Sequence, residues 1–340
     1  MTNALDIQTQ YPLKNHNSFG IAAKAELFLC VSSLEQLRQV ASQACLLPRL
    51  VLGGGSNLIL SDELPYLVLQ MALKGRAIIA SDENFTLVEV AAGENWHEFV
   101  QWTLAQGLGG LENLSLIPGT VGAAPIQNIG AYGAELQDYF LDLTVFDFAT
   151  AQMRVMSKED CQFGYRDSIF KRDTSKDLVI TSLRFALPKV WQARLSYGDI
   201  AQLLQQRGIT RPSAQDVSDT VMTIRQSKLP DPQVLGNAGS FFKNPMVDSP
   251  TRERLLQTYP HLVSYVQGEG RYKLAAGWLI EQCGWKGRHS GAVGVYEKQA
   301  LVLVNLGGAT GSDVRRVAQE IQADVWHKFA VALEVEPVFI

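Results

Sequence analysis

Stretches rich in apolar, β-branched and aromatic positions, bounded by polar turns, predict strands through much of the first half of this chain. The clearest lie between residues 66 and 187, at Tyr66–Met71, Phe85–Ala91, Phe140–Phe148, Met153–Ser157 and Leu178–Leu187. Residues 20–31 are also predicted to form a strand, and Arg49–Leu60 is predicted to form two strands joined by a glycine turn.

Apolar residues at helical spacing predict helices, most clearly over 312–329. There Val314, Val317, Ile321, Val325 and Phe329 recur every three or four residues. Ser33 and Gln36 are spaced as a capping box before a helix over Leu34–Cys45. Further helices are expected over Trp96–Gln106, Ala214–Ser227, 249–258 and 273–283, and further strands over Val293–Val295, Ala300–Asn305 and Ala330–Phe339.

These elements predict an α+β fold with boundaries near residues 65 and 228. The first 65 residues have the order of a β-α-β-β unit, and strands dominate the section that follows. The segment Leu229-Pro230-Asp231-Pro232 contains two prolines that stop the preceding helix and indicate a linker.

Composition and charge exclude several classes of protein. The chain has 340 residues, 46% of them hydrophobic and 19% charged, with a formal net charge of −4. This balance is ordinary for a globular protein, and no basic cluster indicates a nucleic-acid partner. Residues Met1–Lys14 lack the apolar core of a signal peptide, and no run of about 18 apolar residues predicts a membrane-spanning helix.

The cysteines indicate reduced thiols rather than disulfides or a metal site. Cys30, Cys45, Cys161 and Cys283 show no C-x-x-C and no paired spacing. We therefore expect a soluble cytoplasmic protein that holds no metal.

Two glycine-rich segments predict a nucleotide cofactor. The first is Gly53-Gly54-Gly55-Ser56-Asn57, between apolar runs, where consecutive backbone N–H groups can form a nest for phosphate. It is neither a dinucleotide fingerprint nor a P-loop, and a plain hairpin turn is the alternative. The second is Ile117–Gly133, which holds four glycines and two prolines among small apolar residues. Such a segment lets backbone pass close to a large, flat object.

Three further segments carry candidate catalytic groups, each with a structural alternative. Arg166 either clamps a carboxylate or pairs with the neighbouring Asp167. Ser240, between small residues and two phenylalanines, either presents a hydroxyl in an apolar cleft or serves as a turn or cap residue. Without a G-x-S-x-G elbow or a histidine in a comparable motif, a Ser-His-Asp hydrolase is disfavoured. In the last predicted strand, Glu334 and Glu336 share one face, either towards solvent or with one in a cleft.

Taken together and in this order, these segments resemble the UDP-N-acetylenolpyruvoylglucosamine reductase family (MurB) in its longer, type I form. The resemblance covers nearly the whole chain, from Asn17-Ser18-Phe19-Gly20 to Glu336-Pro337. It implies a fold of the vanillyl-alcohol-oxidase type, with two α/β FAD domains (1–65 and 66–228) and an α/β substrate domain (229–329). Residues 330–340 would return to the active site.

The resemblance also assigns residues to roles. It implies that non-covalent FAD is contacted by Gly53, Gly54, Gly55, Ser56, Asn57, Pro118, Gly119, Thr120, Gly122 and Ala123. The implied catalytic residues are Arg166, Ser240 and Glu336. The implied substrate contacts are Tyr197, Lys228, Asn244, Tyr265 and Gln299, the first two of which are also plausible phosphate ligands by residue type. The chain departs from the family at its end, where Pro337 follows the two glutamates rather than separating them, so Glu334 stays an alternative to Glu336.

The reaction implied is the NADPH-dependent reduction of UDP-N-acetylglucosamine enolpyruvate in peptidoglycan precursor synthesis, by a protein that is a monomer in this family. Hydride would pass through the flavin to C3 of the vinyl group. Arg166 and a protonated Glu336 would stabilise the negative charge that then develops at C2, and Ser240 would protonate C2. One alternative is an FAD-dependent oxidase or dehydrogenase of another alcohol or hydroxy acid on the same fold. A non-catalytic UDP-sugar-binding protein is the other.

Overall fold

The computed structural model describes residues 5–43 and 46–340, which divide into two compact units. Unit 1 takes in the described parts of Met1–Tyr11, Ala25–Gly54 and Pro65–Ser227. Unit 2 takes in Pro12–Lys24, Gly55–Leu64 and Lys228–Ile340. In the described part of the chain, no helix is long and apolar enough to cross a membrane.

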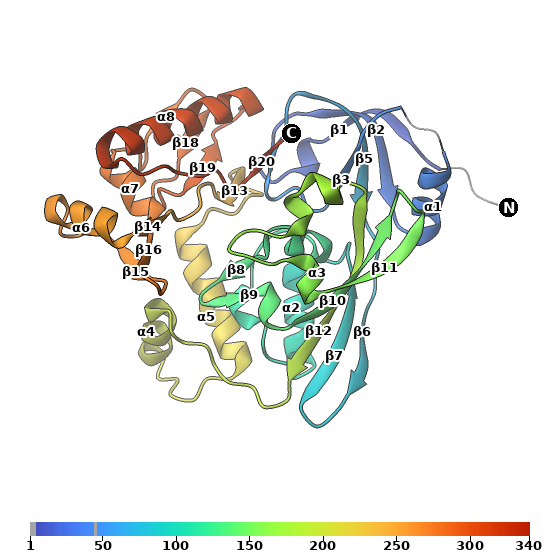
Figure 1. The fold of residues 1–340 in the computed structure, drawn as a ribbon, viewed down its shortest axis with the longest axis horizontal. Coiled ribbons are helices and arrows are strands. Elements are labelled where there is room, and N and C mark those ends of the chain that lie inside the picture. The colour runs from blue at the N-terminus through green and yellow to red at the C-terminus, as the bar shows by residue number, and fades with distance from the viewer. Residues whose placement is uncertain (1–4, 44–45) are drawn as a thin grey trace. The chain divides into compact units, whose positions relative to one another are not determined.

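The larger sheet of unit 1 is antiparallel throughout, and α2 (Trp96–Ala105) packs against it (Figure 1). Its strand order is β11 (Gln152–Ser157), β10 (Phe140–Asp147), β12 (Leu178–Pro188), β7 (Phe85–Ala91) and β6 (Arg76–Ser81). The core between helix and sheet is aromatic, with the rings of Phe99 and Phe185 5.5 Å apart. Alternate residues of β7 and β12 are buried, which is why their composition predicted strands correctly.

The second sheet of unit 1 has the order β1 (Gln8–Pro12), β2 (Lys24–Val31), β5 (Glu63–Met71) and β3 (Arg49–Leu52). α1 (Leu34–Ser42) packs its Leu37 and Val40 into the core cluster of these strands. The capping box of Ser33 and Gln36 is confirmed. The helix ends at Ser42, and the predicted end at Cys45 lies outside the described residues.

Short helices complete unit 1. A 3-10 helix, η3 (Val121–Gln127), lies within the glycine-rich segment, and α3 (Lys158–Cys161) follows β11. The short strands β8 (Gly130–Ala131) and β9 (Ala134–Glu135) follow η3 and form a two-stranded sheet. α4 (Gly198–Gln206) and α5 (Ala214–Lys228) share an apolar core of their own.

Unit 2 contains three small sheets and three α-helices. One sheet has the order β13 (Asn237–Ser240), β19 (Val302–Asn305), β18 (Val293–Val295) and β17 (His289–Ser290). Another has the order β14 (Met246–Asp248), β16 (Arg271–Leu274) and β15 (Ser264–Val266). The third pairs β20 (Val338–Phe339) with β4 (Leu58–Ile59) in parallel. The helices are α6 (Ser249–Thr258), α7 (Ala276–Gln282) and α8 (Gly311–Phe329).

Several expectations about local structure are wrong. The two strands predicted within Arg49–Leu60 are present, but the alternative of a plain hairpin is wrong, because β3 pairs with β5 and β4 pairs with β20. The predicted helix over 273–283 begins at Ala276, and its first residues belong to β16. β6 and α4 were not predicted.

The strand predicted over Ala330–Phe339 is mostly irregular. Val331 and Leu333 are buried, which produces the alternation, but backbone pairing is limited to a bridge at Val335 and to β20. Apolar alternation therefore reports packing here rather than a continuous ladder of hydrogen bonds.

Gly109→Ala is expected to destabilise unit 1. A Cβ at this position would lie 2.4 Å from Cδ1 of Trp191, whose Nε1 donates to Oε1 of the buried Glu112 at 2.8 Å. Displacing the ring weakens the hydrogen bonding of a buried carboxylate, which costs about 1–3 kcal/mol, or roughly 2–4 °C in melting temperature per kcal/mol.

Thermal unfolding followed by circular dichroism measures this effect. Gly164→Ala is the matched control, because its Cβ would meet its nearest neighbour at 3.7 Å, an ordinary contact. Equal melting temperatures for the two variants would contradict the packing of Trp191 on Gly109.

Candidate functional site

The glycine turn after β3 lies directly against the second glycine-rich segment. In unit 1, a Cβ on Gly54 would lie 2.9 Å from Cα of Gly119, and one on Gly53 would lie 2.5 Å from Oγ1 of Thr120. Both distances are shorter than real Cβ contacts allow. The glycines are needed here because two stretches of backbone touch, whereas the sequence predicted that the second segment passes close to a large, flat object.

Residues 119–122 are held to the residues around the start of α2. The N–H of Trp96 donates to the carbonyl of Gly119 at 3.1 Å, and the N–H of Val121 donates to that of Glu94 at 2.9 Å. A Cβ on Gly122 would lie 2.6 Å from the Cβ of Ala92. This segment is fixed along its length, so its side chains have set directions.

One polar atom of this segment has no partner. Oγ1 of Thr120 is fully buried and makes no hydrogen bond to any residue that the structure describes, although Thr120 precedes the first turn of η3. An unsatisfied buried hydroxyl costs free energy unless a ligand completes it. Thr120 therefore fits a place where a cofactor supplies the missing group.

The rest of the glycine turn belongs to unit 2. Gly55 has φ +61°, and a Cβ there would lie 2.1 Å from the carbonyl oxygen of His16, so glycine is required. Asn57 is tied to the end of the chain, because its Nδ2 donates to the carbonyl of Glu336 at 3.3 Å and its carbonyl accepts the N–H of Val338 at 3.0 Å.

Arg166 lies at the centre of a tight turn in unit 1. The N–H groups of Gly164 and Asp167 each donate to the other residue's carbonyl, and Arg166 has φ +54°, which few non-glycine residues adopt. Its Nη2 donates to the carbonyl of Gly130 at 2.5 Å. A Cβ on Gly130 would lie 2.9 Å from Nη1 of Arg166, so the guanidinium packs directly against a glycine of the second glycine-rich segment.

The structure excludes an ion pair between Arg166 and Asp167, which was the structural alternative. The carboxylate of Asp167 instead accepts two hydrogen bonds from Arg172, at 2.7 and 2.5 Å. These bonds hold the pKa of Asp167 below its usual value. The neighbouring acid is therefore occupied, and Arg166 is not neutralised by it.

Ser240 and Glu336 are brought together in unit 2. Ser240 ends β13 with an exposed side chain, directly before the fully buried Phe241 and Phe242. The carbonyl of Phe241 accepts the N–H of Glu336 at 2.9 Å, so the two candidate catalytic residues lie on adjoining stretches of backbone. The sequence placed them almost 100 positions apart and could not show this contact.

Glu334 lies in a different setting. Its side chain is 70% exposed and forms an ion pair with Nζ of Lys243. The side chain of Glu336 is partly buried. The two glutamates are therefore not equivalent, although strand alternation predicted one shared face.

The candidate substrate contacts are distributed over both units. In unit 1 the ring of Tyr197 packs edge-on to that of Tyr132, with centroids 5.6 Å apart. In unit 2, Oδ1 of Asn244 accepts the N–H of Ala276 at 3.0 Å. Lys228 is the last residue of α5. Tyr265 on β15 is paired with Lys273 on the neighbouring strand β16. Oε1 of Gln299 would lie 3.0 Å from a Cβ on Gly277.

Arg225 on α5 is a residue that the sequence prediction missed. Its Nε is buried without a hydrogen-bond partner among the described residues. Its position in the sequence could have indicated this burial, because Val217, Val221 and Arg225 are spaced four residues apart and therefore lie on one face of a predicted helix.

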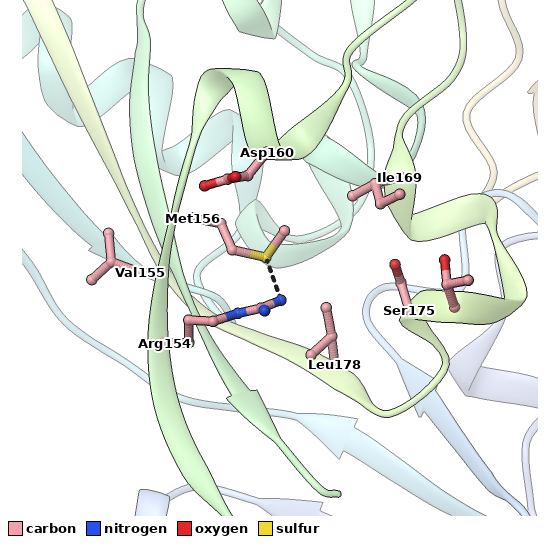
Figure 2. A pocket seen from close by; sticks show the side chains of 8 residues that line it. Arg154, Val155, Met156, Asp160, Ile169, Ser175 and Leu178 are labelled. Carbon is pink, nitrogen blue, oxygen red and sulfur yellow. Dashed lines mark hydrogen bonds between the residues drawn. The ribbon is translucent and has the colours of Figure 1, made fainter. Parts of the chain in front are cut away.

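Figure 2 shows a pocket of about 320 Å³ in unit 1 that contains none of the predicted site residues. It is lined by residues of β11 and the turns that follow, among them Arg154, Met156 and Asp160. Nη2 of Arg154 contacts Sδ of Met156 at 3.7 Å, and Asp160 accepts the N–H of Ser157 at the start of α3. These are local structural contacts, so this pocket is not the candidate site.

Comparison with known proteins identifies relatives along the whole chain. Residues 25–157 match the family "FAD binding domain", and residues 231–340 match "UDP-N-acetylenolpyruvoylglucosamine reductase, C-terminal domain". A UDP-N-acetylenolpyruvoylglucosamine reductase of Paraburkholderia phytofirmans is 54% identical over 332 residues, covering 96% of both chains. One of Pseudomonas putida is 53% identical, covering 97% of this chain and 98% of the relative.

A solved structure shows the same fold. The UDP-N-acetylenolpyruvylglucosamine reductase (MurB) of Thermus caldophilus superposes with a TM-score of 0.69 at 24% identity, covering 99% of this chain and 98% of the other. Together with the FAD-domain match, this confirms the α+β, FAD-binding fold that the sequence predicted.

Asp167→Asn is expected to loosen the turn that carries Arg166 and to lower the melting temperature by no more than about 3 °C at pH 7, because the pair with Arg172 is partly exposed. The folded-state pKa of Asp167 is depressed, so this contribution is complete above the unfolded value of about 3.9 and disappears as the pH falls through the folded value.

Melting curves of the parent and of Asp167→Asn between about pH 2 and pH 7 test this sign. The two curves should converge at the acid end. A difference that grows with acidity would mean that the pair does not depress the pKa of Asp167.

Proposed function

The chain belongs to the UDP-N-acetylenolpyruvoylglucosamine reductase family, and from that premise we propose how its own residues divide the reaction. It is an FAD-dependent oxidoreductase of peptidoglycan precursor synthesis, which reduces the enolpyruvyl group of UDP-N-acetylglucosamine enolpyruvate to UDP-N-acetylmuramate with NADPH. The observation that carries this function is 54% identity over 96% of both chains to a reductase of that name. The alternative of an oxidase or dehydrogenase acting on another alcohol or hydroxy acid is not favoured by these relatives.

The two glycine-rich segments are proposed to hold FAD, which carries hydride from NADPH to the sugar when bound. Gly53, Gly54, Gly55, Ser56 and Asn57 would donate to the pyrophosphate from backbone and side chain, and Pro118, Gly119, Thr120, Gly122 and Ala123 would line the remainder. The unpartnered hydroxyl of Thr120 supports this assignment, since a bound cofactor would complete its hydrogen bonding.

Arg166 is proposed to bind the carboxylate next to the reacting vinyl group. Hydride arriving at C3 leaves negative charge at C2, and this charge spreads into that carboxylate. A cation fixed before the reaction stabilises the charge without reorganising. The tight turn and the contact with Gly130 support this role, because they keep the guanidinium oriented, and the carboxylate of Asp167 is paired with Arg172 instead.

Ser240 is proposed to donate the proton that completes the reaction at C2. An alcohol is a weak acid, but a carbanion is a base strong enough to take its proton when the geometry is right. The backbone of Phe241 holds Ser240 by donating to Leu301 at 2.7 Å and accepting from Glu336. Glu336, in its protonated form, would add a hydrogen bond to the charge at C2.

The remaining assignments are also proposals. Tyr197, Lys228, Asn244, Tyr265 and Gln299 would bind the UDP diphosphate and the sugar. The division into 1–65, 66–228 and 229–329 with a returning 330–340 segment, the cytoplasmic location and the monomeric state are proposed on the same family grounds.

Ser240→Ala is expected to separate the two halves of the reaction. Flavin reduction by NADPH should stay near the parent rate, while reoxidation by the enolpyruvyl sugar slows about 100-fold or more, because the general acid is gone. Anaerobic stopped-flow absorbance at the visible flavin band follows both steps in one sample.

Failure of the unmodified enzyme to reoxidise with this sugar would reject the proposed function. Equal losses in both steps of Ser240→Ala would reject only the role of Ser240.

Glu336→Gln is expected to slow sugar reduction by about tenfold or more, whereas Glu334→Gln should leave it near the parent rate. Glu336 adjoins Ser240, and Glu334 is 70% exposed and paired with Lys243. The same stopped-flow measurement compares the two, each variant serving as the other's control. Slow sugar reduction in Glu334→Gln, together with a parent-like rate in Glu336→Gln, would assign the catalytic role to Glu334 instead of Glu336.

A further inference from the structure

Asn128 is a fully buried asparagine in the second glycine-rich segment, where it ends η3. Its backbone is left-handed, with φ +45°, a conformation that asparagine tolerates better than most residues with a side chain. A buried carboxamide must satisfy its own polar atoms, so the partners of Asn128 show which parts of unit 1 it holds together.

The carboxamide of Asn128 binds two other segments of unit 1. Its Nδ2 donates to the carbonyl of Gly164 at 3.1 Å and to Oε2 of Glu135 at 2.8 Å. Its Oδ1 accepts the N–H of Gln137 at 3.1 Å. Two acceptors lie at one end of the amide and a donor lies at the other, so the group has one orientation.

The bond to Gly164 fixes the turn that carries Arg166. The carbonyl of Gly164 also accepts the N–H of Asp167 at 3.3 Å, which helps to close that turn. A carbonyl oxygen has two lone pairs, and this one accepts from both Asp167 and Asn128. The turn is therefore attached to Asn128 two positions before Arg166.

The bond to Glu135 fixes the strands that the guanidinium of Arg166 contacts. Glu135 on β9 is paired with Gly130 on β8, and the carbonyl of Gly130 accepts from Nη2 of Arg166 at 2.5 Å. Nε2 of Gln137 donates to the same Oε2 of Glu135 at 2.6 Å, so this carboxylate is held by two amides. One carboxamide therefore joins the backbone turn of Arg166 to the strand pair at the other end of its side chain.

Holding both ends of this side chain has a physical purpose. An arginine side chain has several rotatable bonds, and ordering them costs conformational entropy. A cation that stabilises a developing negative charge must nevertheless be in place before the charge appears. A fixed separation between the turn of Arg166 and the carbonyl of Gly130 restricts the guanidinium to one position.

We propose that Asn128 is the positioning residue for Arg166. Its carboxamide sets the separation between the turn that carries Arg166 and the β8–β9 strand pair, and so places the guanidinium where the carboxylate of the substrate binds. This inference rests on the proposed function, because Arg166 receives its role there, and it adds the residue through which that role is made precise.

Asn128→Gly tests the proposal, because glycine keeps the left-handed backbone and removes the carboxamide. Flavin reduction by NADPH should stay near the parent rate. Reoxidation by the enolpyruvyl sugar should slow about tenfold or more, because a displaced guanidinium stabilises the charge at C2 less well. The loss should lie in the limiting rate at saturating sugar, since that charge develops only during hydride transfer. Anaerobic stopped-flow absorbance of the FAD-loaded enzyme measures both steps.

The same substitution in Arg166→Met separates positioning from general support of the fold. An effect transmitted through Arg166 disappears once Arg166 is gone, so the double variant should be reoxidised at the rate of Arg166→Met alone. An equal fold-loss from Asn128→Gly in both backgrounds would show that Asn128 acts independently of Arg166, and would overturn the proposal.

Thr181→Val is the matched control. Thr181 is buried in the large sheet of the same unit, and its Oγ1 donates to the carbonyl of Thr144 on β10 at 3.0 Å. Valine keeps the shape of the side chain and removes this buried hydrogen bond. Both steps should stay near the parent rate, and a selective loss of sugar reduction as large as that of Asn128→Gly would overturn the proposal.

The remaining outcomes are also decisive. A parent-like rate of sugar reduction in Asn128→Gly, or equal losses in both steps, would overturn the role of Asn128 and leave the proposed function standing. A parent enzyme that the sugar does not reoxidise would reject the proposed function, and this role with it. Should Asn128→Gly not fold, Asn128→Asp keeps the acceptor for Gln137 and removes both donors. Slow sugar reduction in that variant supports the proposal, and a parent-like rate overturns it.

Discussion

The close approach of two glycine backbones is the constraint on which the candidate cofactor site depends. Gly54 lies against Gly119, and Gly53 lies against Thr120, at separations that leave no room for a Cβ. This contact joins the end of β3 to a segment that is also bonded to the residues around the start of α2. Any larger side chain would move these parts away from each other, and the directions of Thr120 and of the residues beside it would change with them.

Several groups in unit 1 break local rules. Arg166 has a left-handed backbone, and Oγ1 of Thr120 and Nε of Arg225 are buried without a hydrogen-bond partner among the described residues. Nearby groups obey the rules, as the paired Asp167 and Arg172 do. Unfavourable local features persist only where the surrounding structure holds them, and they are concentrated where chemistry is carried out.

Local patterns in the sequence predicted local structure well. The capping box at Ser33, the helix 312–329 and four of the five strands of the large sheet depend on residues a few positions apart, and each of these predictions is confirmed. Part of what local patterns left open depends on distant partners, whereas β6 and α4 are local elements that no pattern predicted. β4 pairs with β20, which follows almost 280 residues later, so no local signal could have separated it from a hairpin with β3. The sequence also left open whether Asp167 pairs with Arg166, and its carboxylate binds Arg172 instead.

The two glutamates at the end of the chain show how environment divides roles that spacing leaves equal. Glu334 and Glu336 alternate with apolar residues, and by sequence alone either could enter a cleft. Glu334 is exposed, and its carboxylate is already paired with Lys243. Glu336 is partly buried, and its backbone is joined to Phe241, next to Ser240. The role proposed for Glu336, a hydrogen bond to the charge at C2, is better suited to the second setting than to the first.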